Sequence, residues 1–274
     1  QAFAARIVFG DGKVSEIAAE VDRLGANAAL LVSTGSQRAV ADAAEAALGN
    51  NCAARIDGAV MHVPRADVQD AVALAQQHKC DCVVAIGGGS AIGVAKGVAL
   101  ETELPIIAVP STYAGSEMTD IWGISEGDGK VTGRDQRVVP KCVIYDPDLT
   151  RGLPPRIAGP SGINAMAHSV EALYAQNRNP VLSLIAEDGI RALASGLPAV
   201  CDGSRLCKNV WEFIVTLRRG ILVTVSRVFE LMPLVRSYRP DIAVLAAGCP
   251  ESGVNRGGRA PTPPASPRSA PRCR

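Results

Sequence analysis

Three absences narrow the classes of protein to which this 274-residue chain can belong. Every long apolar run is interrupted by charge. The most apolar stretch, Phe213 to Val235, contains three arginines and a glutamate, which argues against a membrane span. No Cys-x-x-Cys pair with a histidine partner occurs, so no motif indicates a zinc site. No secretory signal opens the sequence at Gln1.

Histidine is also scarce, because His62, His78 and His168 are the only three in the chain. We expect His62 and His78, at a strand end and a helix end, to be structural. The eight cysteines do not form a disulfide scaffold in a chain of this length. Cys80 and Cys82 lead into an apolar strand, and we expect them to pack in a reducing cytoplasm.

The composition changes character near Val200. Residues 1–200 hold 16 Lys and Arg against 22 Asp and Glu, a net charge of −6, whereas residues 201–274 hold 12 against 5, a net charge of +7. Eight of the 18 prolines also follow residue 200, and Gly253 to Arg274 has a composition typical of disorder. A nucleic-acid-binding tail is one interpretation. We favour a truncated or frame-shifted gene, so that 201–274 is an unmatched, basic, Pro- and Arg-rich segment.

Short apolar runs alternate with segments of helical spacing through the first 150 residues. The expected strands are Ala5 to Phe9, Ala28 to Val32, Val60 to Val63, Cys82 to Ile86, Ile106 to Val109, Trp122 to Ser125 and Lys141 to Tyr145. The expected helices are Val14 to Leu24, Gln37 to Leu48, Val68 to His78 and Ala91 to Leu100, the third with Asp67 as N-cap. Because most of these strands are continuously apolar, they predict a parallel sheet covered on both faces, an α/β domain spanning 1–153.

The strand Cys82 to Ile86 runs directly into Gly87, Gly88, Gly89 and Ser90, and a helix is expected to follow. A glycine turn that opens a helix lets backbone N–H groups and the helix dipole meet a phosphate. A plain connection between strand and helix is the alternative.

Two further polar loops follow expected strands, at Ser33-Thr34 and at Ser111-Thr112. Because ligands of parallel sheets bind at the carboxyl ends of the strands, three such loops together favour a dinucleotide site. The hydroxyl-rich stretch Ser111 to Thr119 is predicted to contact phosphate or nicotinamide, with a surface loop as the alternative. Gly127 to Lys130 has the composition of a hairpin turn.

Helical character dominates after Pro154 and Pro155. Ser161 is a candidate N-cap for a helix from Ile163 to Ala175, and a second helix is expected from Pro180 to about Ala194. Residues 154–200 therefore predict the start of a helical domain, with the ligand between the two domains. Three polar residues share one face of its first helix by their i, i+4, i+7 spacing, namely Asn164, His168 and Glu171.

Four motifs, in this order, resemble the iron-containing alcohol dehydrogenase superfamily. They are Gly87 to Ser90, Pro110 to Thr119, Val143 to Pro147 and Gly162 to Ala172. Within that superfamily, Tyr113 to Thr119, Ile121 to Gly123 and Lys130 to Asp135 are similar to the maleylacetate reductase branch. The resemblance covers roughly residues 3–200. It implies an α/β dinucleotide-binding domain followed by an all-helical domain. It also implies reduction of the carbon–carbon double bond of maleylacetate to 3-oxoadipate by NADH or NADPH, in the degradation of aromatic and chloroaromatic compounds.

The resemblance also implies roles for individual residues. Gly87, Gly88, Gly89 and Ser90 would hold the pyrophosphate. Ser111, Thr112, Tyr113 and Ser116 would lie along the pyrophosphate and nicotinamide, Ser33 and Thr34 near the adenosine, and Lys130 near the cofactor. Asn164 and His168 would meet the substrate, with His168 the candidate catalytic residue. We expect a cytoplasmic homodimer acting on a small molecule, with no nucleic acid or membrane as partner.

Two departures from the superfamily pattern bear on metal binding. Asn164 stands where the metal-dependent relatives have an aspartate that holds iron or zinc together with histidines, and an amide is a poor substitute for a carboxylate on a hard cation. The reductase branch resembles this chain in having Asn there, so we expect no metal. The superfamily also continues through a longer helical domain that supplies further histidines, and residues 201–274 contain none.

Three hypotheses therefore remain open. The first is a maleylacetate-type reductase, and the second a metal-dependent alcohol or glycerol dehydrogenase. The third is an inactive fragment that binds dinucleotide and exposes apolar surface where missing helices would pack. Spacing alone would make His168 a surface residue paired with Asn164 or Glu171, whereas the resemblance places it between the domains. Ser33 and Thr34 lack the acidic side chain that selects NAD, so the sequence leaves NADH and NADPH equally open.

Overall fold

The protein is represented by a computed structural model that describes residues 5–59, 62–127, 129–151, 153–176 and 178–201. The basic segment expected after residue 200 lies almost wholly outside the described residues. Within the described residues, no helix is long and apolar enough to cross a membrane. The stretch Phe213 to Val235 lies outside that search.

A six-stranded parallel sheet forms the first domain, as the apolar strands predict. Its spatial order is β1-β8-β5-β4-β2-β3, with all neighbouring pairs parallel. The strands are β1 (Arg6–Phe9), β2 (Ala29–Ser33), β3 (Cys52–Asp57), β4 (Cys82–Gly87), β5 (Ile106–Pro110) and β8 (Cys142–Tyr145). The α/β class is therefore confirmed.

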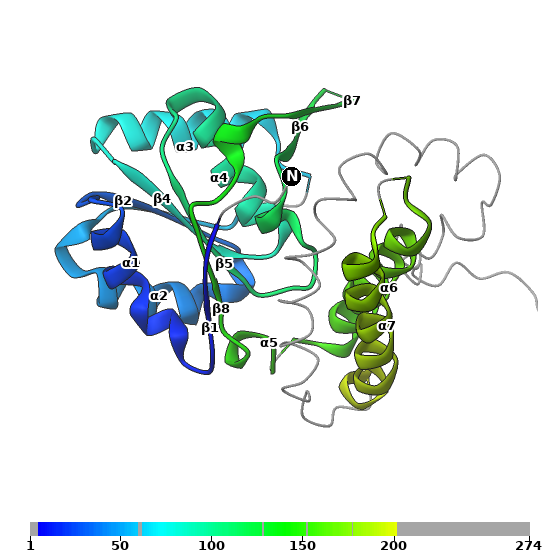
Figure 1. Ribbon diagram of the computed structural model, residues 1–274. Coiled ribbons are helices and arrows are strands. Elements are labelled where there is room, and N and C mark those ends of the chain that lie inside the picture. Colours follow the sequence, from blue (N-terminus) through cyan, green and yellow to red (C-terminus); the bar gives the residue numbers. More distant parts are fainter. Residues whose placement is uncertain (1–4, 60–61, 128, 152, 177, 202–274) are drawn as a thin grey trace, which may run out of the picture.

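Helices cover both faces of this sheet (Figure 1). They are α1 (Ile17–Arg23), α2 (Arg38–Leu48), α3 (Arg65–Gln77) and α4 (Gly89–Thr102). Successive side chains of a strand point to opposite faces, and β4 obeys this rule. Val83 and Ala85 pack in the core with α3 and α4, whereas Val84 and Ile86 pack in the core with α1 and α2.

Two α4 glycines allow this helix to lie close to its neighbours. A Cβ at Gly93 would stand 2.4 Å from a methyl of Val63, and one at Gly97 would stand 2.7 Å from both methyls of Val68.

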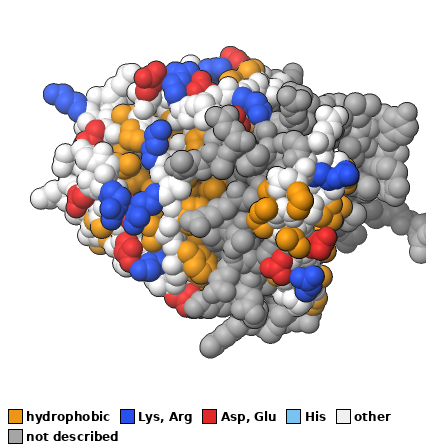
Figure 2. All heavy atoms as spheres, in the orientation of Figure 1, with side chains coloured by type: hydrophobic (Ala, Val, Ile, Leu, Met, Phe, Trp, Pro, Cys, Tyr) orange, Lys and Arg blue, Asp and Glu red, His pale blue; other side chains and the backbone are white. Residues whose placement is uncertain are grey.

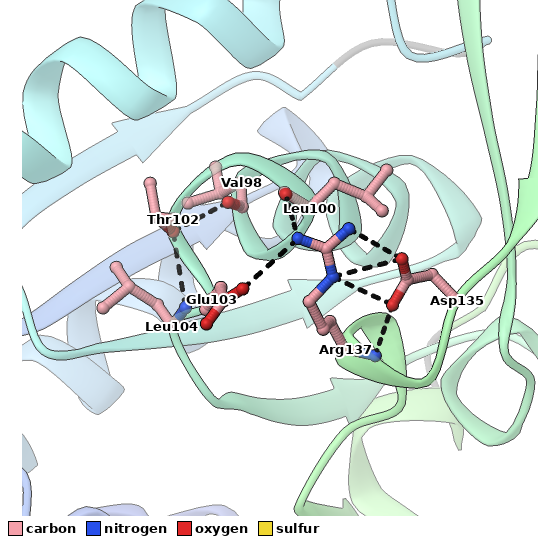
Figure 3. A network of polar contacts seen from close by, with 7 residues as sticks. All are labelled: Val98, Leu100, Thr102, Glu103, Leu104, Asp135 and Arg137. Atoms are coloured by element: carbon pink, nitrogen blue, oxygen red, sulfur yellow. Dashed lines mark hydrogen bonds and ion pairs between the residues drawn. The ribbon is translucent and has the colours of Figure 1, made fainter.

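The C-terminus of α4 is held by Arg137, which donates to the carbonyl of Leu100 at 3.0 Å and pairs with Asp135 at 2.7 Å (Figure 3). Because the last carbonyls of a helix lack partners within the helix, this contact secures its C-terminus.

A two-stranded antiparallel hairpin, β6 (Ile121–Glu126) and β7 (Gly129–Arg134), stands apart from the sheet (Figure 1). The turn composition of Gly127 to Lys130 correctly predicts a hairpin there. The strand Lys141 to Tyr145 is not its partner, because Cys142–Tyr145 joins the main sheet as β8.

After a short helix α5 (Asp148–Arg151), two long helices pack against each other: α6 (Pro155–Tyr174) and α7 (Pro180–Cys201). Small residues line the buried side of α6, namely Ala158, Gly162, Ala165, Ser169 and Ala172. A Cβ at Gly162 would stand 2.1 Å from a methyl of Leu197, so glycine allows α7 to approach closely. Helices α6 and α7 agree with the helical segment that the sequence predicts for residues 154–200. The domain boundary at 153/154 stays a prediction.

Two local predictions between residues 60 and 67 are wrong, and two strands were not predicted. The predicted strand Val60 to Val63 is absent in its described part, because His62 and Val63 have positive φ and neither is in a strand. Val60 and Met61 lie outside the described residues. The strands missed are β3, whose half-exposed residues give no apolar run, and the exposed hairpin strand β7. Asp67 is not an N-cap, because Pro64 takes that position and α3 begins at Arg65.

Ser161 is likewise not an N-cap. Helix α6 begins six residues earlier, at Pro155, with Pro154 as its N-cap. The sequence misleads here because Pro160 is usually a helix breaker, and a helix start after it was the simpler interpretation. Within α6, Ser161 instead directs its hydroxyl oxygen to the neighbouring domain.

Candidate dinucleotide-binding site

The glycine turn between β4 and α4 fits between two threonines. A Cβ at Gly87 would stand 3.0 Å from both Oγ1 and Cγ2 of Thr34, and one at Gly88 would stand 3.0 Å from Cγ2 of Thr112. Gly87 also has a φ of +147°, which side chains disfavour. Only glycine therefore allows the chain this path at the carboxyl edge of the sheet.

Helix α4 presents its N-terminus at the same place. Its N-cap is Gly88, which has no side chain to bond the first-turn N–H groups, and Gly89 at the helix start is exposed. Uncapped first-turn N–H groups and the helix dipole both favour an anion. The turn thus fits the pyrophosphate of a dinucleotide in its donors, since the uncapped N–H groups lie where its glycines add no side chain.

The loop after β5 runs beside this turn. The backbone N–H of Ser111 donates to the carbonyl of Gly87 at 2.9 Å, which joins the two strand ends. Thr112 faces Gly88, and the buried Tyr113 donates its N–H to Oγ of Ser161 at 2.9 Å. Of the predicted cofactor residues of this loop, Ser111, Thr112 and Tyr113 therefore lie between the glycine turn and α6.

A buried lysine supports the far end of this loop. Lys96, in the middle of α4 and 1% exposed, donates from Nζ to the carbonyl of Thr119 at 2.8 Å, to Oγ1 of Thr119 at 2.9 Å and to the carbonyl of Ile121 at 2.6 Å. Burial lowers the pKa of Lys96 to about 7, and the nearby Asp120 opposes this shift. The loop from Ser116 onward is thus held by the same helix that begins at the glycine turn. The sequence alone gave no sign of this role, because a lysine in an apolar helix is normally solvated.

A second buried contact lies below the loop. Tyr145, at the end of β8, donates its hydroxyl to Oε1 of Glu117 at 2.8 Å, and both side chains are buried. Ser116 begins the short 3₁₀ helix Ser116–Met118 to which Glu117 belongs. Ser116, a predicted cofactor residue, is therefore anchored through its neighbour to the sheet.

Ser33 and Thr34 lie at the end of β2, next to the glycine turn. The backbone N–H of Thr34 donates to the carbonyl of Ile86 at 3.3 Å, and the side chain of Thr34 lies against Gly87. Ser33 is buried and donates its hydroxyl to Oδ1 of Asp57 at 2.6 Å. Asp57 was missed by sequence reasoning because it ends β3, the strand that was not predicted.

Lys130 lies elsewhere, on the exposed hairpin strand β7. Its stem crosses to β6, where a Cβ at Gly123 would stand 2.6 Å from Cε of Lys130. No described contact joins Lys130 to the glycine turn, and its place near a cofactor stays a prediction.

Asn164 and His168 both lie on α6, the helix that Ser161 connects to the loop after β5. His168 is 28% exposed, and its Nδ1 lies 3.1 Å from Oε2 of Glu171. This is the pairing that spacing alone predicts, and it also fixes the ring with Nε2 pointing away from Glu171. The structure thus leaves both interpretations of His168 standing.

An iron site does not fit the donors present. In the part of the chain that the structure describes, no group of three or more His, Cys, Asp and Glu side chains is placed to hold a metal. Asn164 and His168 together supply one amide and one imidazole, fewer and weaker donors than a hard cation requires. The expectation that no metal is needed stays a prediction.

Comparison with known proteins places these observations in a family. The sequence profile of iron-containing alcohol dehydrogenase matches residues 4–147. The chain is 51% identical over 197 residues to maleylacetate reductase 2 of Cupriavidus pinatubonensis, and 49% identical over 195 residues to maleylacetate reductase of Sphingobium indicum. These alignments cover 72% and 71% of this chain but 55% of each relative, so the chain spans about half their length.

A solved structure agrees with the sequence comparison. The crystal structure of maleylacetate reductase from Rhizobium sp. strain MTP-10005 superposes with a TM-score of 0.74 at 41% identity, covering 82% of this chain and 65% of that one. The matched profile spans more than half of the sequence and contains the whole six-stranded sheet with its glycine turn. The chain is an oxidoreductase homologue that belongs to the iron-containing alcohol dehydrogenase family.

Proposed function

We propose that this chain is the dinucleotide-binding part of a reductase that converts maleylacetate to 3-oxoadipate with NADH or NADPH. The observation that carries the proposal is the cradle of Thr34, Gly87, Gly88 and Thr112, in a chain about half identical to proteins named maleylacetate reductase. Gly87, Gly88 and Gly89 place no side chain over the uncapped N-terminus of α4, where a phosphate would bind.

In this proposal the first domain binds and orients the cofactor. The glycine turn, from Gly87 to Ser90, holds the pyrophosphate with its N–H groups. Ser111, Thr112, Tyr113 and Ser116 line the path toward the nicotinamide, and Ser33 and Thr34 lie toward the adenosine. Lys130 would approach the cofactor from the hairpin.

Bound NADH or NADPH would supply a hydride for the double-bond carbon of maleylacetate that is farther from the ketone. Because that double bond is conjugated to a ketone, the electron pair moves onto the ketone oxygen, where hydrogen-bond donors stabilise the charge. Asn164 and His168, on α6, are the candidates to bind the substrate. His168 is also the candidate to return a proton, and Glu171 would keep the ring oriented for that step.

A second candidate function is supported by a separate observation. Figure 2 shows hydrophobic side chains gathered on the α6–α7 hairpin. The large exposed ones on these two helices are Ile157, Ile163, Val170, Tyr174, Val181 and Leu184, between 36% and 68% exposed. Exposed apolar surface is expected where further helices of a longer relative would pack. The second candidate is therefore a fragment that binds dinucleotide without turnover.

One titration tests the proposal and separates the two candidates. Purified chain is titrated with NADH and with NADPH while its thermal unfolding is followed, because a ligand that binds only the folded state raises the melting temperature. A shift with either nucleotide supports the cofactor site; no shift in a chain that unfolds cooperatively would refute it. Adding maleylacetate then distinguishes a reductase, which oxidises the nucleotide, from a binding fragment, which does not. Metal analysis of the same sample tests the metal-dependent dehydrogenase.

A further inference from the structure

An arginine and an aspartate face each other at the carboxyl edge of the sheet, two strands away from the glycine turn. Nε of Arg38, the first residue of α2, lies 3.8 Å from Oδ2 of Asp57, the last residue of β3. The other oxygen of Asp57 accepts from Oγ of Ser33 at 2.6 Å and from Nε of Arg55 at 2.9 Å. Oδ1 of Asp57 is therefore held by two hydrogen bonds, whereas Oδ2 makes a longer and weaker ion pair with Arg38.

The position of this pair relative to the glycine turn follows from the strand register. Ser33 pairs with Ile86 of β4 on one side and with Asp57 of β3 on the other. Neighbouring strands are about 4.8 Å apart, so Asp57 stands about 10 Å from the end of β4 along the sheet edge. In the proposed function the adenosine lies on the side of Ser33 and Thr34, so its ribose would extend toward this part of the sheet edge.

Two arginines stand near Asp57, and they differ in how strongly they are held. Arg55 is 16% exposed and contacts three carboxylates, those of Asp42, Glu45 and Asp57. Arg38 is 74% exposed, and within the described residues its one ion pair is the 3.8 Å contact with Asp57. Because the Arg38 guanidinium has donors to spare and a long mobile stem, it can turn to a new anion at little cost.

Asp57, in contrast, is poorly suited to select NADH. An acidic residue favours NAD when its free oxygens accept from the ribose hydroxyls. Here one oxygen already has two donors, and the other faces a cation. Hydrogen bonds from Arg55 and Ser33 keep the pKa of Asp57 below its usual value, so the carboxylate remains charged and continues to attract Arg38.

We propose that Arg38 binds the 2′-phosphate of NADPH and that Asp57 holds the Arg38 guanidinium at this edge when no phosphate is present. The proposal rests on the cofactor site of the proposed function and deepens it, since it names the nucleotide that the chain prefers. A guanidinium pairs with phosphate through two parallel, charge-assisted hydrogen bonds, which NADH cannot form for lack of the phosphate. NADPH should therefore bind more tightly than NADH.

Calorimetric titration of the whole chain with NADPH, NADH, 2′,5′-ADP and 5′-AMP tests the proposal. The two adenosine probes carry or lack the 2′-phosphate and do not involve the nicotinamide, so the measurement is independent of turnover. In Arg38→Gln the dissociation constants of NADPH and 2′,5′-ADP should rise about tenfold or more, as expected for loss of a charged hydrogen bond. Those of NADH and 5′-AMP should change less than about twofold. Arg191→Gln is the matched control, because Arg191 on α7 is 72% exposed and pairs with one carboxylate, that of Asp188.

A second variant separates phosphate binding from a merely structural effect. Asp57→Asn keeps the shape of the side chain but removes its negative charge, which releases Arg38 and ends the repulsion between Asp57 and a phosphate. It should tighten 2′,5′-ADP and NADPH and leave 5′-AMP nearly unchanged, whereas loss of a structural contact would weaken all four ligands together.

The outcomes distinguish this inference from the proposed function. If Arg38→Gln weakens NADH and NADPH equally, or if the unmodified chain binds NADH more tightly than NADPH, the assignment of Arg38 is overturned while the cofactor site stands. If the unmodified chain binds none of the four ligands, the cofactor site fails, and the role of Arg38 fails with it.

Discussion

Tyr113 donates its backbone N–H to Oγ of Ser161 at 2.9 Å, and this bond joins the loop after β5 to helix α6. Tyr113 is fully buried, so its N–H depends on this acceptor. The same loop carries Ser111 and Thr112 beside the glycine turn, and the same helix carries Asn164 and His168. One hydrogen bond thus connects the elements that carry the proposed cofactor residues with those that carry the proposed substrate residues.

Replacing Ser161 with Ala should destabilise the chain by about 1–3 kcal/mol, because it leaves the buried N–H of Tyr113 without its acceptor. Equilibrium unfolding in urea measures the change. Ser195→Ala is the matched control, since Ser195 on α7 is exposed and donates its hydroxyl to the carbonyl of Ala192 in its own helix. Equal stability of the Ser161 and Ser195 variants would show that the bond from Tyr113 contributes nothing.

Replacing Gly88 with Ala should weaken nucleotide binding about tenfold or more, which corresponds to about 1.4 kcal/mol. Gly88 has an ordinary φ of −86°, so alanine fits the backbone, but its Cβ would stand 3.0 Å from Thr112 inside the cradle. Calorimetric titration with the tighter-binding nucleotide measures the loss.

Gly129→Ala is the control for this substitution, because the nearest heavy atom to a Cβ there is 3.7 Å away, on the hairpin. It should leave the affinity unchanged. Unchanged affinity in Gly88→Ala as well would mean that the turn does not contact the nucleotide.

Replacing Lys96 with Met should change how stability depends on pH. Burial lowers the pKa of Lys96 from 10.5 to about 7 in the folded chain. Between about pH 7 and pH 10.5 the unfolded chain therefore holds a proton that the folded chain lacks, and the Lys96 contribution to stability rises with pH across this window. It is lost as the pH falls from 10.5 through 7. As the pH rises, the unfolding free energy of the unmodified chain should therefore increase relative to that of Lys96→Met.

The comparison with Lys96→Met cancels other groups that titrate in the same range. Burial raises the pKa values of the Cys80 thiol to about 11 and of the Cys82 and Cys142 thiols to about 12, which makes stability fall as the pH rises through about 9. These thiols are present in both proteins. Parallel stability curves for the two proteins between pH 7 and pH 10 would contradict the lowered pKa.

The sheet could be predicted where its strands are continuously apolar. Strands β2, β4 and β5 are fully buried on both faces, so apart from Ser33 at the end of β2 their residues are not polar, and the apolar runs are visible in the sequence. Strand β3 lies at the edge of the sheet with half-exposed residues, and its sequence has no such run. Missing β3 also meant missing Asp57, and with it the partner of Arg38.

The sequence by itself determined the α/β class, the glycine turn and the family, because these depend on apolar periodicity and on residue types in a fixed order. Tertiary structure alone decided which polar groups meet. Ser161 lies 48 positions after Tyr113, Asp57 24 positions after Ser33, and Thr119 23 positions after Lys96. Nothing in local composition specifies such pairs, since each depends on strand order and helix packing that bring distant segments of the chain to one edge of the sheet.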